Sequence, residues 1–177
     1  MVVSPAPQGW QSDKFVRLSP QSFSQAVSLT RTADTEDYTA NDVLGAATGS
    51  TAALEFTAMG PDARRIMLTS AELEVDAGAL ISGEGNYRLH LYNVTPPSAL
   101  GDNVAFDLPS GDRASYLGYL DLGTPIDLGT TLYIQTDGIN KQIKLSGTSI
   151  FAYLVTIGAF TPASATVRKI TLHSIAL

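Results

Sequence analysis

The chain contains no cysteine among its 177 residues. Disulfide bonds, thiolate nucleophiles and cysteine-ligated zinc are therefore excluded. No stretch approaches the roughly 18 consecutive apolar residues that indicate a transmembrane helix. The N-terminal sequence MVVSPAPQGWQSDKF lacks the basic and apolar regions of a signal peptide. We therefore expect synthesis in a cytoplasm and no contact with a membrane.

Charge is scarce, and basic charge is the scarcest. Charged residues make up 16% of the chain, against about 25% in an average soluble domain. Asp and Glu number 17 and Lys and Arg 11, giving a net charge of −6. Nucleic-acid binding depends on Lys and Arg that neutralise phosphates, so no nucleic-acid partner is expected. The shortage indicates either a surface covered by a partner or a neutral face of Thr, Ser, Asn and Gly.

Long amphipathic helices are missing too, and β-strand patterns take their place. Apolar and polar residues alternate over 52–59, 64–78 and 87–94, which is typical of half-buried strands. Residues 148–160 are nearly all apolar and predict a central strand buried on both faces, and 165–177 predict a last strand. A short helix competes with a strand over 112–123. The pair Asp137-Gly138 predicts a hairpin within 130–147.

Short β runs also occur at 14–20 and 22–30. Together these segments give eight or nine strands and predict an all-β fold, an antiparallel β-sandwich with the jelly roll as the leading candidate. The Cys–Trp–Cys pattern of immunoglobulin domains is absent. We expect a single β-sandwich domain over residues 29–177. Residues 1–28 predict a partly extended N-terminal arm, because its beginning contains Pro5, Pro7 and Gly9 without periodicity. Trp10 and Phe15 are the candidate partner contacts on this arm, although Trp10 could instead fold back on the domain.

An acidic stretch, RTADTEDYTANDVLG (31–45), offers the candidate metal ligands Asp34, Asp37 and Asp42. Calcium is bound by closely spaced carboxylate oxygens, but the turn glycine and closing glutamate of an EF-hand loop are not in place. The competing interpretation is a solvated turn. In it, Tyr38 packs inward and residues 41–42 turn the chain into a strand at 43–44.

Other possible catalytic groups are isolated. Glu72 and Glu74 share one strand face about 6.5–7 Å apart, which suits glycoside hydrolysis and equally an ordinary solvated face. His90 and His173 each lie on an expected strand, where a metal or catalytic role competes with a structural or interface role. The motifs G-x-S-x-G and G-x-G-x-x-G do not occur. We therefore expect no enzyme activity and no cofactor.

Three segments carry a resemblance to known proteins: TRTADTEDYTANDVLG (30–45), LHLYNVTPPSALGDNVAFDL (89–108) and FTPASATVRKITLHSIAL (160–177). Together they resemble the small all-β structural proteins of tailed bacteriophage virions. The resemblance implies a capsid decoration or cementing protein, or one associated with the head or tail. It carries over no catalytic residue, because such proteins work by contact.

The leading hypothesis is therefore a virion structural protein made in the host cytoplasm. It would decorate or cement the capsid exterior as a homo-oligomer, with a trimer favoured, and its partner would be the major capsid protein or another virion protein. A second hypothesis is a carbohydrate- or receptor-binding module of a tail or fibre, which needs exposed aromatic residues; the candidates are Tyr87, Tyr92, Tyr116, Tyr119 and Tyr133. A third is a metal-dependent enzyme on a β-sandwich.

Overall fold

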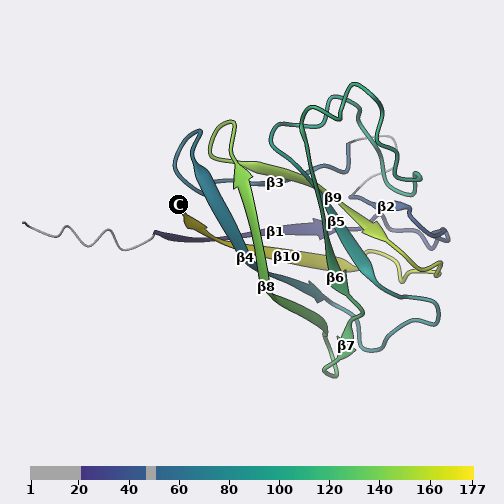
Figure 1. The fold of residues 1–177 in the computed structure, drawn as a ribbon. Helices are drawn as coiled ribbons and strands as arrows, with labels where there is room; N and C mark the ends of the chain where they lie inside the picture. Colours follow the sequence, from purple (N-terminus) through teal and green to yellow (C-terminus); the bar gives the residue numbers. More distant parts are fainter. Residues whose placement is uncertain (1–20, 47–50) are drawn as a thin grey trace, which may run out of the picture.

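The computed structural model describes residues 21–46 and 51–177, and every regular element in these ranges is a β-strand (Figure 1). The all-β prediction is confirmed. Trp10 and Phe15 lie outside the described residues. Within the described ranges, no helix is long and apolar enough to cross a membrane.

One sheet has five strands in the order β1-β10-β4-β8-β7, with antiparallel pairing throughout. Their bounds are β1 Ser22–Thr30, β10 Val167–Ala176, β4 Arg65–Val75, β8 Leu132–Lys144 and β7 Ile126–Asp127. The alternation read in 64–78 produces β4, in which Ala71, Leu73 and Val75 are buried while Glu72 and Glu74 are half-buried. Strand β1 begins at Ser22, so the β run expected at 22–30 belongs to this sheet, although the predicted arm extends to residue 28.

The second sheet has the order β2-β9-β5-β6, and β3 also pairs with β9. Its strands are β2 Val43–Leu44, β3 Leu54–Phe56, β9 Ile150–Thr156, β5 Tyr87–Tyr92 and β6 Tyr116–Gly123. The apolar run at 148–160 forms β9, the central strand, as its composition predicts. The segment at 112–123 contains the strand β6, so the alternative of a short helix is wrong.

The strand order defines the topology. Strands β2 and β3 pair with successive parts of β9 and act as two halves of one strand, and β7 is a two-residue addition to β8. The eight remaining units, numbered along the chain, run 1-8-3-6 in one sheet and 2-7-4-5 in the other. Two interlocked four-stranded sheets of this kind make a jelly roll. The jelly-roll prediction is therefore confirmed.

The expected hairpin over 130–147 is wrong, because these residues form one long strand. Asp137 still faces Ser70 of β4, and Lys141 faces Leu68, so the residues between them bulge out of the ladder. Gly138 and Asn140 take φ angles of 67° and 49° inside this bulge. Both a hairpin turn and a bulge need residues that tolerate positive φ, so the Asp-Gly signal marked the irregularity but not its type.

The main core lies between the two sheets and contains aromatic and aliphatic side chains from both. A second apolar cluster lies on the outer face of the β2-β9-β5-β6 sheet, where Tyr92 and Tyr153 pack with Phe106 and Leu108. The loop 93–115 covers this face and is fastened to it by backbone hydrogen bonds, including Ala52 N–H to the Leu100 carbonyl at 2.7 Å. One sheet of the sandwich is therefore covered by the chain's own loop.

Candidate functional site

The three carboxylates proposed as calcium ligands have separate partners. Asp34 pairs with Arg31 at 2.6 Å, and Asp37 accepts a hydrogen bond from the Thr161 hydroxyl. Asp42 accepts hydrogen bonds from the Thr39 amide at 2.5 Å and the Thr39 hydroxyl at 3.0 Å. In residues 21–46 and 51–177, no group of three or more His, Asp or Glu side chains could hold a metal ion.

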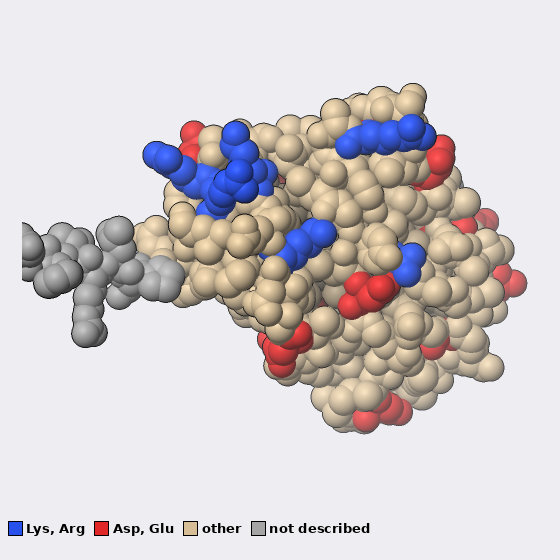
Figure 2. Space-filling view, in the orientation of Figure 1, with Lys and Arg blue, Asp and Glu red and all other residues tan. Residues whose placement is uncertain are grey.

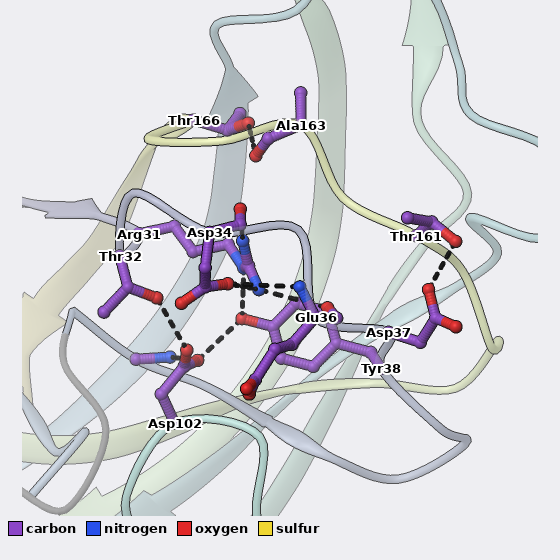
Figure 3. A network of polar contacts seen from close by, with 11 residues as sticks. Arg31, Thr32, Asp34, Glu36, Asp37, Tyr38, Asp102, Thr161, Ala163 and Thr166 are labelled. Atoms are coloured by element: carbon purple, nitrogen blue, oxygen red, sulfur yellow. Dashed lines mark hydrogen bonds and ion pairs between the residues drawn. The ribbon is translucent and has the colours of Figure 1, made fainter.

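The acidic stretch instead wraps around a buried arginine (Figure 3). Arg31 is 3% exposed and donates hydrogen bonds from Nε to the Tyr38 hydroxyl at 2.8 Å and from Nη1 to the Asp34 carbonyl at 2.6 Å. Tyr38 in turn donates to Asp102 at 2.6 Å, which also accepts from the Gly45 amide at 2.7 Å. The expected inward packing of Tyr38 is therefore confirmed.

This network joins segments that are far apart in sequence. Asp102 belongs to the loop that covers the second sheet, Gly45 follows β2, and Arg31 follows β1. The pKa of Asp34 lies below its ordinary value because the Thr32 hydroxyl stabilises the carboxylate, with further help from the Glu36 amide and Arg31. A carboxylate that remains ionised keeps its pairing with Arg31, so we assign this cluster a structural role.

The paired glutamates of β4 lie on the outer face of the five-stranded sheet and have basic partners on β10. Glu74 is 3.0 Å from Lys169, and Glu72 is 3.5 Å from His173. The two carboxylates therefore point to different neighbours along one solvated face. This arrangement matches the interpretation of an ordinary strand face.

His90 lies on the opposite side of the molecule, on the outer face of the second sheet. Its ring stacks on Phe106 with centroids 3.7 Å apart, and its Nδ1 is 2.9 Å from the Tyr116 hydroxyl. Burial, aided by the nearby charge of Arg88, lowers the pKa of His90 to about 4. The imidazole is therefore neutral at pH 7 and serves as an aromatic packing residue. The structure does not bring it together with His173, which lies on the other sheet.

Of the five tyrosines proposed as a sugar-binding platform, only Tyr116 and Tyr119 share a surface, where both rings lie beside His90. Tyr87 and Tyr92 are completely buried. Tyr119 is exposed on β6 beside Arg88, whose guanidinium lies 4.3 Å from the ring centroid. Tyr133 lies on β8 in the other sheet, opposite Glu74. Their placement does not favour a sugar site.

The outer face of the β1-β10-β4-β8-β7 sheet is not covered by any other described strand. Exposed small side chains of β1 face the solvent beside the half-buried Lys169 and His173 of β10. On β4 and β8 the face continues with Glu72, Glu74 and the exposed Gln135. Figure 2 shows Lys and Arg gathered near the start of β4 and the end of β8. This neutral, uncovered sheet is the best candidate contact surface.

The structure contains a buried ion pair at the end of the sandwich that the sequence patterns did not predict. Arg168 on β10 is 1% exposed and lies 3.9 Å from Glu84, which is 4% exposed. Glu84 also accepts hydrogen bonds from the Tyr87 hydroxyl and the Ile81 amide. The alternation of the last strand could have indicated that Arg168 is buried, because it lies two residues from the buried Ile170 and so on the same face of β10.

Comparison with known proteins gave matches to solved structures only. No protein-family model matches the chain, and no curated protein matches it. The chain is similar to "Capsid of Ralstonia phage GP4", with 12% identity, a TM-score of 0.39, and coverage of 99% of this chain and 90% of that chain. It is also similar to Desmodium yellow mottle tymovirus, with 13% identity, a TM-score of 0.29, and coverage of 99% and 94%.

A third structure, of Cocksfoot mottle virus, has 9% identity and a TM-score of 0.33, with 99% of this chain and 94% of that chain covered. Identities and TM-scores this low do not transfer a function from those proteins to this chain.

Proposed function

We propose that this chain is a non-enzymatic structural protein of a phage virion. It binds the capsid exterior as a homo-oligomer, with a trimer as the favoured form, and contacts the major capsid protein or another virion protein. The observation that carries the proposal is a jelly roll with one sheet covered by its own loop and the other left open. Adhesion through a neutral sheet face requires such an uncovered surface.

The chemistry of the open face supports a contact role. One ion pair on this face joins neighbouring strands, Glu74 with Lys169 at 3.0 Å, and this pairing offsets part of the cost of covering the two charges. Much of the face is contributed by uncharged polar and small side chains of β1, β10 and β8, such as Ser24, Thr171 and Gln135. Uncharged polar side chains cost less hydration energy to bury against another protein than charged ones do.

The lack of catalytic geometry among the described residues points in the same direction. His90 bonds to a tyrosine hydroxyl and His173 is near a glutamate, so in this part of the chain neither histidine hydrogen-bonds a serine hydroxyl. A nucleophile activated by a histidine would need such a bond. The sequence resemblance to phage virion proteins and the acidic net charge of −6 agree with a position outside the DNA-filled shell.

The test is binding of the purified protein to capsids that lack it. Gln135→Glu places an uncompensated charge in the open face, at an exposed position beside Glu72 and Asp137. Ser110→Glu is the matched control, because Ser110 is exposed in the loop that covers the other sheet. We expect the first variant to lower capsid occupancy and the second to leave it unchanged. Equal occupancy for both variants would remove the open face from the proposal.

The N-terminal arm is tested separately. Deletion of residues 1–13 removes Trp10 and is expected to weaken attachment to capsids, because aromatic residues often dominate the binding energy of an interface. Phe15 is tested by Phe15→Ala in the full chain. Occupancy equal to that of the unmodified protein in both variants would count against the arm as a contact.

A further inference from the structure

The sheets of this protein have four free edges among the described residues, and three of them carry features that hinder pairing with another strand. The edge formed by β2 and β3 consists of strands of two and three residues. The β6 edge has register irregularities and positive φ angles at Gly118 and Gly123. The β8 edge carries a bulge and the charged Lys141 and Lys144. Short strands, bulges and charges are the usual protections of sheet edges.

Strand β1 has none of these protections. It runs for nine residues, SFSQAVSLT, without a charged residue, proline or glycine. Its register with β10 is unbroken from Ser22, opposite Ile175, to Thr30, opposite Val167. Among the described residues, no strand pairs with its other side. An uncharged, regular edge of this length is a template for a further strand.

The hydrogen bonds at the ends of β1 show which backbone groups are free. The Ala176 amide donates to the Gln21 carbonyl at 2.9 Å, and the Arg31 amide donates to the Thr166 carbonyl at 3.1 Å. Both bonds extend the β1–β10 ladder by one pair at each end, and on the β1 side they use the odd-numbered residues Gln21 and Arg31. Since antiparallel strands alternate between hydrogen-bonded and non-bonded pairs, the even-numbered residues direct their N–H and C=O groups to the free edge. These are Ser22, Ser24, Ala26, Ser28 and Thr30.

The free edge matches itself under a two-fold rotation. An antiparallel pairing centred on Ala26 sets Ala26 opposite Ala26 of a second copy, Ser24 opposite Ser28, and Ser22 opposite Thr30. Every such pair joins even-numbered residues, so all the free backbone groups are satisfied by about ten hydrogen bonds. Small hydroxyl and methyl side chains face one another, and no like charges meet.

We propose that β1 pairs with β1 of a second copy of this chain, antiparallel and centred on Ala26, to join two five-stranded sheets into one. A second copy is the favoured occupant because the edge is self-complementary in charge, in side-chain size and in backbone polarity. A contact through one strand is smaller than the roughly 1,200–2,000 Å² of a stable complex, so the dimer is weak and depends on concentration. The pairing does not rest on the proposed function, since it forms without a capsid.

The absence of cysteine from the chain provides a test of register by disulfide formation. Hydrogen-bonded antiparallel pairs have Cα atoms about 5.5 Å apart, within the range of roughly 4.4–6.8 Å that a disulfide bridges. Ala26→Cys should therefore give a covalent dimer under mild oxidation. Ser22→Cys is the matched control, because the two copies of residue 22 would lie about 27 Å apart at ~3.4 Å per residue. The double variant S22C/T30C should again give the dimer.

A backbone variant tests the same contact without relying on side-chain reach. Ala26→Pro removes an N–H that points to the free edge and spares the bonds to β10, a position where sheets tolerate proline. Added to S22C/T30C, it should abolish the crosslink while circular dichroism and the melting temperature stay near those of S22C/T30C.

Three results would overturn the pairing. The first is an Ala26→Cys crosslink no stronger than that of Ser22→Cys. The second is an S22C/T30C crosslink that survives Ala26→Pro. The third is an Ala26→Cys crosslink that appears only after deletion of residues 1–20. This result would mean that residues 1–20 block the edge in the full chain. No crosslinking together with normal capsid binding would reject the pairing alone. Crosslinking without capsid binding would reject only the proposed function.

Discussion

The buried pair of Arg168 and Glu84 gives the sharpest prediction about stability. Glu84→Gln keeps the shape of the side chain but removes the charge that faces Arg168. Its amide oxygen can still accept from the Ile81 amide, and its NH2 group can donate to the Tyr87 hydroxyl, which is both donor and acceptor. At the observed 3.9 Å, two unit charges attract by about 4 kcal/mol at an effective dielectric constant near 20. Breaking a buried ion pair by removing one partner typically costs about 3–5 kcal/mol.

Arg168 is poorly compensated by other groups, which makes this cost hard to avoid. Its Nε and Nη1 atoms are buried without a hydrogen-bond partner in the structure. We therefore expect Glu84→Gln to lower the free energy of unfolding by about 3–5 kcal/mol, and the melting temperature by about 6–20 °C for a protein of this size. Urea unfolding followed by circular dichroism measures the loss.

A double variant separates the charge effect from packing. Because replacing both members of a buried pair by uncharged groups is often neutral or stabilising, R168M/E84Q should recover most of the loss. Glu74→Gln is the surface control. Its pair with Lys169 is 37–43% exposed, so its loss should cost no more than about 1 kcal/mol. The reasoning is refuted if Glu84→Gln costs no more than Glu74→Gln, or if the double variant is less stable than Glu84→Gln.

Three further predictions concern other parts of the fold. Burial holds the pKa of His90 at about 4, below its usual 6.5, so between these pH values the unfolded chain binds a proton that the folded chain does not. We therefore expect the free energy of unfolding to be unaffected by His90 above pH 6.5 and to fall by at most about 3 kcal/mol towards pH 4. His90→Gln should flatten this part of the profile of stability against pH. Gly83→Ala should destabilise the fold strongly, because Gly83 has a φ of 87° and an added Cβ would lie 2.1 Å from a backbone oxygen. The control Gly111→Ala should have the melting temperature of the unmodified protein, because no atom lies within 4 Å of the new Cβ. Tyr38→Phe removes one buried hydrogen bond from Arg31 and one from Asp102. The free energy of unfolding should fall by about 1–3 kcal/mol for each group left unpaired. A change below about 1 kcal/mol would show that the network around Tyr38 is not structurally important.

Local sequence patterns predicted most of the strands, because the alternation of adjacent residues determines which face of a strand is apolar. Alternation in residues 64–78 identified both the strand β4 and its buried face, and the apolar run at 148–160 identified the central strand. The failure at Asp137-Gly138 has a physical cause. Positive φ is required by a turn and by a bulge alike, and only the pairing of β8 with β4 along its whole length decides between them.

The contacts that position the functional surfaces were beyond local patterns. Asp102 joins Tyr38 and Gly45 across more than fifty residues of sequence, and nothing near Asp102 in the sequence distinguishes it from a solvated carboxylate. Which sheet face is covered depends on the path of the loop 93–115, which packs Phe106 onto His90. The carboxylates of the acidic stretch, considered first as metal ligands, are explained by partners such as Arg31 that only the fold brings to them.

The central claim is that this chain is an abundant structural component of the capsid exterior, and the most direct test is its copy number and position in purified virions. Quantitative mass spectrometry against the major capsid protein, combined with antibody labelling of intact particles, gives both. We expect a copy number in a fixed ratio to that of the major capsid protein, as the symmetry of the shell requires, and antibody label spread over the whole head. A small number of copies labelled only at the tail, or absence of the chain from the particle, would contradict it.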